Sequence, residues 1–198
     1  FHYNNTSSFE PRAGLKWIFR PEHTLSLGYG YHSQLAPITV YFYQTRLPDQ
    51  SYLRPNENLD MIHSQHFVTG YDWNINTNLR LKSEMYYQRI SNAGVDGHKE
   101  NSYSILNQGA NFGVWSPDTL VNEGTGRNYG IDLTLEKFLS DGIYYLVTAS
   151  LYDSKYKGSD GIERNTAFNG NYVLNGLIGK EWNLSRDPEK RKKKQFLL

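Results

Sequence analysis

Every second residue of a segment near the N-terminus is apolar, and the residues between them are mostly polar or small. The apolar positions are Phe9, Pro11, Ala13, Leu15, Trp17 and Phe19, and the interleaved positions from Glu10 to Arg20 are polar or glycine except Ile18. Successive side chains of a β-strand point to opposite faces, so this alternation predicts a strand with one apolar and one polar face. The pattern recurs along the chain and predicts a sheet with lipid on one side and water on the other.

The composition agrees with a β-sheet in a membrane better than with a packed soluble core. Only 38% of residues are hydrophobic, whereas about 45–50% is usual in soluble domains when glycine is counted. Sixteen Tyr against two Met favour strands. The sequence contains no apolar run of the length that a transmembrane helix needs, which excludes a helical membrane protein. A transmembrane barrel needs only about 10 residues per strand, half of them facing lipid.

Charge and cysteine content exclude several classes of function. The net charge is +1, so no overall field points to nucleic acid as a partner. Residues 186–194 are locally basic, and we interpret them as a solvated turn. Cysteine is absent, which excludes disulfides and thiolate metal sites. Because the chain starts at Phe1 without Met and stops at Leu198 inside a new apolar run, we expect residues 1–198 to be one segment of a longer polypeptide.

The alternating segments predict seven strands and the start of an eighth. The expected strands are residues 9–20, 24–35, a strand ending at 67–73, 79–88, 128–136, 143–152 and 171–182. Short turns follow the first, third, fifth and seventh strands, at 21–23, 74–78, 139–142 and 183–194. Long loops follow the others, at 36–58, 91–126 and 153–169. Such an all-β, antiparallel up-and-down meander, with its long loops at one rim, is the arrangement of a partial transmembrane β-barrel. The facing of the sixth strand stays open.

Aromatic residues fall into two groups near the strand ends. One group lies beside the short turns and the other toward the long loops: Trp17, Phe19, Tyr71, Trp73, Phe138 and Trp182, against Tyr29, Tyr31, Tyr86, Tyr87, Tyr129 and Tyr152. Two aromatic belts are what the two interfaces of a bilayer select. The alternative is a soluble β-sandwich, such as a carbohydrate-binding module, whose core shows the same alternation. That alternative leaves unexplained why all long loops fall at one end.

Several segments resemble the strands of a known family of barrels. They are residues 124–131, 133–137, 150–156 and 164–170, together with 10–12, 26–34 and 65–71 earlier in the chain. In order and spacing they are similar to strands of TonB-dependent outer-membrane receptors, most of all the type common in Bacteroidota. The resemblance covers nearly the whole chain and implies a piece of the C-terminal part of the barrel.

The resemblance also implies a function and partners. Such receptors have about 22 strands around an N-terminal plug and import scarce nutrients with energy delivered by TonB. It implies an outer-membrane transporter rather than an enzyme, without a cofactor, with membrane lipid and the TonB complex as partners and the plug absent from this chain. The nutrient could be a siderophore, cobalamin, a glycan or a peptide. A partial barrel leaves two open edges that other strands must cover.

The polar faces of the strands predict a wall that lines the barrel lumen. Its expected members are Arg12, Lys16, Arg80, Lys82, Glu84, Asp132 and Glu136. The strands that carry Arg80 and Glu136 should be antiparallel neighbours, with both residues near the short-turn rim, so we expect a cross-strand ion pair between them. We interpret this wall as structural support that is hydrated against the plug rather than as a substrate path.

Catalytic and metal-binding patterns are weak in this sequence. His63 and His66 lie three residues apart in a strand and therefore face opposite sides, which argues against a shared metal ion. Residues 153–163 resemble a calcium loop only faintly, because Lys155 and Lys157 stand where oxygen ligands are needed. No segment marks a nucleophile elbow or a catalytic triad. The sequence therefore predicts no metal site and no enzyme.

We expect the long loops to determine ligand specificity, because they contain aromatic residues that could contact a ligand. The candidates are Tyr41, Phe42 and Tyr43 in the first long loop and Phe112 and Trp115 in the second. Their rings could stack on sugars or an apolar ligand, or grip a surface lipoprotein that acts as a lid. The alternative is that they pack the loops against one another.

Overall fold

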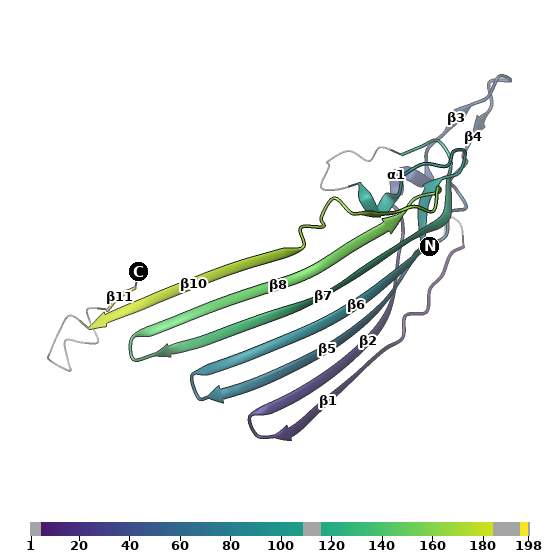
Figure 1. Cartoon of the computed structure of the whole chain (residues 1–198). Helices are drawn as coiled ribbons and strands as arrows, with labels where there is room; N and C mark the ends of the chain where they lie inside the picture. The colour runs from purple at the N-terminus through teal and green to yellow at the C-terminus, as the bar shows by residue number, and fades with distance from the viewer. Residues whose placement is uncertain (1–4, 109–115, 184–194, 198) are drawn as a thin grey trace.

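The protein forms one curved antiparallel sheet, a single layer thick, with most loops gathered at one rim (Figure 1). A computed structural model describes residues 5–108, 116–183 and 195–197. The sheet contains, in order, β1 (Arg12–Arg20), β2 (His23–Gln34), β5 (Ile62–Asn76), β6 (Leu79–Asp96), β7 (Leu120–Ser140), β8 (Ile143–Lys157), β10 (Tyr172–Asn183) and β11 (Gln195–Leu197). The predicted meander of seven strands and the start of an eighth is confirmed. β1 and β11 form the two edges, and the barrel is not closed.

Short turns and long loops alternate as predicted. Turns of two residues join β1 to β2, β5 to β6 and β7 to β8, whereas the connections after β2, β6 and β8 are long. In the last of these turns Asp141 and Gly142 both have positive φ, which suits a tight hairpin. The long connections contain α1 (Ile38–Tyr41), β3 (Thr45–Arg46), β4 (Tyr52–Leu53), η1 (Ile105–Asn107) and β9 (Glu163–Asn165). No helix in the described ranges is long and apolar enough to cross a membrane.

The strands beside the second long loop extend further than the alternation predicts. β6 ends at Asp96 rather than near residue 88, and β7 begins at Leu120 rather than near 128, so the loop shrinks from 91–126 to 97–119. The added end of β6 lacks alternation because residues 93–96 are all buried. The added start of β7 does alternate between exposed Glu123 and Thr125 and buried Gly124 and Gly126, but glycine at the buried positions leaves no apolar pattern in the sequence. Conversely, β1 starts at Arg12 rather than Phe9, which lies outside the sheet and is 85% exposed.

A close approach between these two strand ends depends on glycine. A Cβ at Gly124 would lie 2.6 Å from Val95 Cγ1 and 2.7 Å from the carbonyl oxygen of Ala93. The pairing of β6 with β7 shifts register on both sides of Ala93, and the nearby Asn92 has a φ of +59°. The upper parts of β6 and β7 are therefore packed in a way that a side chain at position 124 would prevent.

One face of the sheet is apolar, and none of the residues that the structure describes forms a second layer over it. The register aligns Leu15, Leu27, Thr69, Met85, Ile131, Leu151 and Tyr172 in one row across the strands. Leu15 is 62% exposed and Leu151 is 61% exposed. β8 faces the same way with Val147, Ala149 and Leu151, which settles the facing that the sequence left open. A sandwich would cover this face with a second sheet, so an exposed single layer indicates that the face meets lipid.

Aromatic rings border this apolar face at both levels. Tyr29, Phe67, Tyr87 and Tyr129 form a row toward the long loops, with Tyr29 and Phe67 centroids 5.0 Å apart. Near the short turns, the His23 ring stacks between its neighbours, with its centroid 5.5 Å from that of Phe19 and 5.6 Å from that of Trp73. In the register of β7 these two levels correspond to Tyr129 and Leu135, and the apolar residues Ile131 and Leu133 lie between them on the same face.

Two tyrosines of the expected upper belt lie on the other face. Tyr86 pairs with Gly130, and Tyr152 pairs with the same glycine from the opposite side. A Cβ at Gly130 would lie 2.7 Å from the hydroxyl of Tyr86, so the ring of Tyr86 lies over that glycine. The strand period puts Tyr86 and Tyr152 in the lumen, next to Tyr87 and Leu151 that face lipid.

Candidate functional site

The lumenal face carries all seven residues of the predicted polar wall. The register puts the even-numbered residues of β1, β2 and β5–β8 on this face, among them Arg12, Lys16, Arg80, Lys82, Glu84, Asp132 and Glu136. Lys82 forms an ion pair of 2.7 Å with Glu84 on its own strand. The wall therefore combines cations and carboxylates along the lumenal face, from Arg80 and Glu136 near the short turns to Arg12 nearer the long loops.

The ion pair of Arg80 differs from the prediction. Arg80 lies opposite Glu136 in the register, as expected, but its guanidinium donates two hydrogen bonds to the carboxylate of Asp72. Asp72 lies diagonally across on β5, where the fork of the guanidinium can reach both carboxylate oxygens. The alternation of the strands does not reveal Asp72 as the partner, because the choice between carboxylates on two neighbouring strands depends on side-chain geometry.

Nearer the loops, five neutral polar groups of the lumenal face form a hydrogen-bonded ladder across the strands, at the level of Arg12 in the register. Gln88 donates to Ser64 Oγ at 2.8 Å, and its own amide oxygen accepts from Asn128 at 2.8 Å. Asn128 in turn accepts from Ser154 at 2.6 Å, and Ser154 accepts from Thr166 at 2.8 Å. We call Ser64, Gln88, Asn128, Ser154 and Thr166 the polar ladder. It joins β5, β6, β7 and β8 to the third long loop.

A cavity of about 510 Å³ lies where this ladder meets the second long loop. Its lining combines lumenal residues of the wall with residues of the loop: His32, Ser33, Gln34, Leu35, Pro37, Ile62, Ser64, Gln88, Ile90, Ile105, Leu106 and Gln108. The imidazole of His32 lies over Gly30, where a Cβ would come within 2.5 Å of Nε2. A lining that includes both polar and aliphatic side chains suits a ligand of mixed polarity. We call this cavity the lumenal vestibule.

The first long loop is anchored to the wall through a small core and one buried asparagine. Ala36, Val40, Tyr41, Leu59 and Leu120 form the core. Asn56 has no solvent exposure: its amide oxygen accepts from the backbone N–H of Leu120 at 2.8 Å, and its amide nitrogen donates to the carbonyl of Asp118 at 3.2 Å. The amide of Asn56 thus replaces a strand partner at the start of β7.

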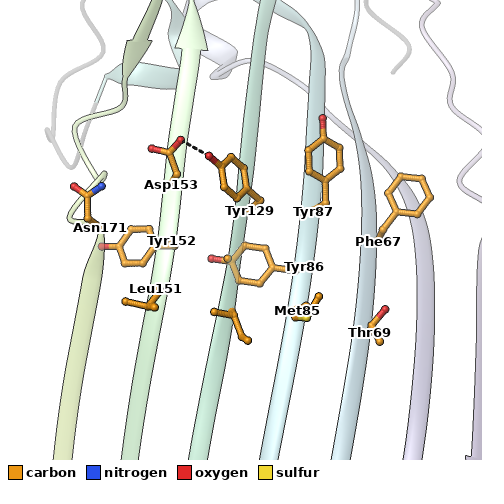
Figure 2. Close-up of a pocket in the computed structure, with 12 residues that line it drawn as sticks. Phe67, Thr69, Met85, Tyr86, Tyr87, Tyr129, Leu151, Tyr152, Asp153 and Asn171 are labelled. Carbon is orange, nitrogen blue, oxygen red and sulfur yellow. Dashed lines mark hydrogen bonds between the residues drawn. The ribbon is translucent and has the colours of Figure 1, made fainter.

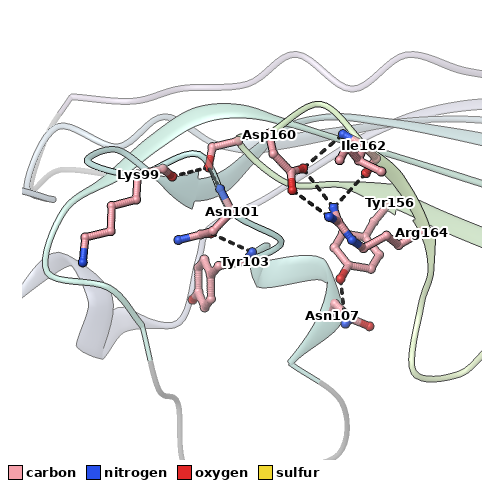
Figure 3. Close-up of polar contacts among 9 residues, drawn as sticks. Lys99, Asn101, Tyr103, Asn107, Tyr156, Asp160, Ile162 and Arg164 are labelled. Carbon is pink, nitrogen blue, oxygen red and sulfur yellow. Dashed lines mark hydrogen bonds and ion pairs between the residues drawn. The ribbon is translucent and has the colours of Figure 1, made fainter.

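The second and third long loops are held together by polar contacts (Figure 3). Ser159 Oγ donates to the carbonyl of Lys99 at 2.7 Å, and the N–H of Asn101 donates to Ser159 Oγ at 3.2 Å. Arg164 donates to both oxygens of Asp160, at 2.9 and 2.7 Å, and this pairing lowers the pKa of the Asp160 carboxyl below its ordinary value. The rim beside the vestibule is therefore pre-organised by cross-links between loops.

The loop aromatics occupy different environments. Tyr41 is completely buried in the loop core and its hydroxyl accepts from the N–H of Ala36 at 3.3 Å, which fits the packing alternative for this residue. Phe42 is 47% exposed. The hydroxyl of Tyr43 donates to Asp118 at 2.6 Å, and this hydrogen bond raises the pKa of Tyr43. Phe112 and Trp115 lie outside the described residues, as does the basic run at 186–194.

The two histidines of the rejected metal pattern lie on opposite faces. His63 pairs with Ser33 on the apolar side of the sheet, whereas His66 pairs with Gly30 on the lumenal side. Among the described residues, no group of three or more His, Cys, Asp or Glu side chains could hold a metal ion.

A polar lumen, a lipid-facing exterior and long loops at one rim agree with the match to a family model. Residues 1–185 match the family described as TonB dependent receptor-like, beta-barrel. The chain belongs to this family. Its members are outer-membrane proteins, and the chain is a segment of such a barrel wall. No match was found among curated protein sequences.

Solved TonB-dependent receptors share the fold of this wall. The ferric-catecholate import receptor Fiu of Escherichia coli K12 superposes with a TM-score of 0.58 at 12% identity, over 89% of this chain and 22% of Fiu. The FrpB iron transporter of Neisseria meningitidis gives 0.56 at 14% identity, over 90% and 25%. The alcaligin outer-membrane receptor FauA of Bordetella pertussis gives 0.56 at 15% identity, over 96% and 31%. The chain thus spans less than a third of the length of each of these receptors.

Proposed function

We propose that this chain is the wall segment of a TonB-dependent import receptor, a transporter rather than an enzyme. The observation that carries the proposal is the asymmetry of the wall. The outer face of the single-layered sheet is apolar, and its inner face carries hydrogen-bonded polar groups. The long loops lie at one rim and are joined to one another by hydrogen bonds. Membership of the receptor family supports the same function. The plug and the segment that contacts TonB would belong to other parts of the full-length protein.

In this proposal the nutrient is first captured at the loops and then held in the lumenal vestibule. Phe42, 47% exposed on the first loop, and Tyr43 offer ring faces at the rim, and Phe112 and Trp115 would add to them. Below, Gln88 lines the vestibule and keeps its place through the polar ladder. Neutral amides bind ligand oxygens without a strong charge, so a ligand can be released downward when the TonB complex moves the plug. A surface lipoprotein could cover the loops as a lid.

The first substrate class to test is a ferric siderophore. Fiu is a ferric-catecholate import receptor, FrpB is an iron transporter and FauA is an alcaligin receptor, and all three share the fold of this wall. The remaining classes are cobalamin, glycans and peptides, because a similar wall could serve each of them.

Uptake by the native host tests the proposal. The gene of the full-length receptor would be deleted, and uptake of radiolabelled ferric siderophores, cobalamin, oligosaccharides and peptides would be measured with TonB intact or inactivated. We expect one class to fall at least tenfold in the deletion strain and to fall equally when TonB is inactivated in the parent. Unchanged uptake of all four classes in the deletion strain would reject the transport proposal.

Paired substitutions test the vestibule in the same strain. Gln88→Ala with Asn128→Ala removes two rungs of the polar ladder, whereas Ser83→Ala with Leu133→Ala changes the lipid-facing side of the same strands. We expect the first pair to weaken ligand binding by full-length receptor about tenfold or more, on the basis of about 1 kcal/mol per lost hydrogen bond. The second pair should leave ligand affinity unchanged. Equal effects of both pairs would place the ligand elsewhere in the barrel.

A further inference from the structure

Basic side chains form a row on the lipid-facing side of the wall, just beyond the upper aromatic row. Arg89, Arg127 and Lys155 are direct neighbours in the register of β6, β7 and β8, and Lys157 occupies the next position above them on the same face. Tyr87 and Tyr129 occupy the next position below them on that face. Aromatic rings of this kind mark the level of the lipid headgroups. The cations therefore stand at the height of the headgroups, outside the barrel.

These cations are only partly neutralised. Arg127 pairs with Glu163 at 2.7 Å, and Lys155 lies 3.7 Å from Asp153. The Nε–H of Arg127 is buried and has no hydrogen-bond partner among the residues the structure describes. In that same part of the chain, neither Arg89 nor Lys157 has an ion pair. Adjacent like charges repel, so a bound anion would stabilise the row.

Two adjoining hollows beside these cations suit the two parts of a lipid, its headgroup and its acyl chain. A polar hollow of about 350 Å³ is lined by the four cations, by Tyr87 and by Glu163, the single carboxylate residue among its lining residues. A larger groove of about 700 Å³ also begins at Tyr87 and continues toward the middle of the apolar band over Met85, Ile131 and Leu151. Figure 2 shows the groove, with Phe67, Tyr87, Tyr129 and Asp153 in its upper row and Met85 and Leu151 below them.

We propose that the polar hollow binds the phosphate group of an outer-leaflet lipid, and that an acyl chain of this lipid lies in the apolar groove. Guanidinium and ammonium groups suit phosphate oxygens, and Arg89 and Lys157 have no carboxylate partner among the described residues. The groove faces lipid rather than water, so a chain-bearing phosphate fits both hollows whereas a free anion fits only one. The site is on the opposite face from the lumenal vestibule and does not depend on which nutrient is transported.

Lipid binding to the full-length receptor tests this inference. Delipidated receptor in an uncharged detergent would be titrated with bisphosphorylated lipid A, with phosphatidylcholine and with inorganic phosphate, and the bound species counted by native mass spectrometry. The triple change Arg89→Gln, Arg127→Gln and Lys155→Gln should weaken lipid A binding at least tenfold. The same triple change should alter phosphatidylcholine binding less than twofold, because that headgroup carries no net charge.

A matched variant separates site binding from overall charge. Arg12→Gln, Lys16→Gln and Lys82→Gln remove the same three charges from the lumenal face and should leave lipid A affinity within twofold of the parent. Equal weakening by both triple variants would overturn the proposal, as would inorganic phosphate binding as tightly as lipid A. If the first triple variant does not fold, judged by heat-dependent gel mobility, Arg89→Gln alone replaces it, with an expected loss of about threefold. No loss with Arg89→Gln would then also overturn the proposal.

Discussion

The lower and upper halves of this wall are built on different rules, although the same strands pass through both. In the lower half, next to the short turns, each side chain faces either lipid or the lumen, and residues 129–137 alternate between these two environments. In the upper half, next to the long loops, a side chain can also be buried in a protein core, because the loops cover the strand ends. Ala93, Val95 and Asn56 are buried in this way. The alternation that a membrane imposes therefore stops where the loops provide a core, and long-range contacts decide the structure instead.

The largest loss of stability is expected from a charge placed on the lipid-facing side of the lower half. Leu133→Arg puts a cation on the lipid-facing side near the middle of β7, whereas Asp132→Arg puts it one residue away in the lumen, opposite Glu84. A cation at the bilayer midplane of a barrel costs about 2–4 kcal/mol, and lumenal substitutions cost far less. Denaturant midpoints of full-length receptor in phospholipid vesicles, followed by tryptophan fluorescence, would show the difference. Equal losses would mean that β7 does not separate lipid from water.

The next comparison is between the effects on stability of replacing one glycine in the upper half and one in the lower half. Gly124→Ala would force a Cβ to within 2.7 Å of the backbone oxygen of Ala93, whereas a Cβ at Gly176 meets nothing within 4 Å. Overpacking of this kind costs about 1–3 kcal/mol. We therefore expect Gly124→Ala to lower the stability measured in vesicles by that amount, and Gly176→Ala to change it by less than about 0.5 kcal/mol. If Gly124→Ala were tolerated as well as Gly176→Ala, β6 and β7 could separate at no cost.

These two halves also explain how far the sequence predicts the structure. Strand order, the turn lengths and the lumenal side of Lys82 and Asp132 follow from a period of two residues, which the bilayer enforces. The end of β6 does not follow, because buried residues such as Val95 lie where both faces are covered. The start of β7 does not follow either, because its buried positions 124 and 126 are glycines rather than apolar side chains. The short strand β9 in the third long loop is not predicted either, because three residues are too few to show an alternating pattern.

Contacts within the candidate site depend on register, which a single sequence does not reveal. Gln88 and Asn128 belong to the polar side of their strands by alternation alone, but that they touch requires the pairing of residue 88 with residue 128. Arg80 binds Asp72 rather than Glu136, although both carboxylates lie near the same guanidinium. Tyr41 and Phe42 look alike in sequence, and only the fold of α1 buries one and exposes the other.

A third prediction concerns the anchor of the first loop. Asn56→Ala leaves the N–H of Leu120 and the carbonyl of Asp118 without their side-chain partner inside the loop core. An unsatisfied buried group costs about 1–3 kcal/mol. We expect hydrogen exchange at Leu120 to accelerate about 5- to 100-fold, while exchange within residues 129–137 stays unchanged. Asn175→Ala, which removes a lumenal side-chain bond of 3.4 Å, serves as the control and should not affect the loop. Acceleration throughout β7 would instead show that the two halves unfold together.

The smallest expected effect is a dependence of the third loop on pH. Hydrogen bonds from Arg164 lower the pKa of Asp160, so the clamp is present above the ordinary carboxyl pKa and is lost as the pH falls through the lowered one. The N–H of Ile162, which donates to Asp160 at 3.0 Å, reports on the clamp. After correction for intrinsic rates, its exchange should speed up about two- to fivefold below that pKa, as for other exposed ion pairs. Asp160→Asn should be fast at every pH. A wild-type profile that stays flat down to the acid limit, with Asp160→Asn equally slow, would show that backbone contacts rather than the ion pair hold the loop.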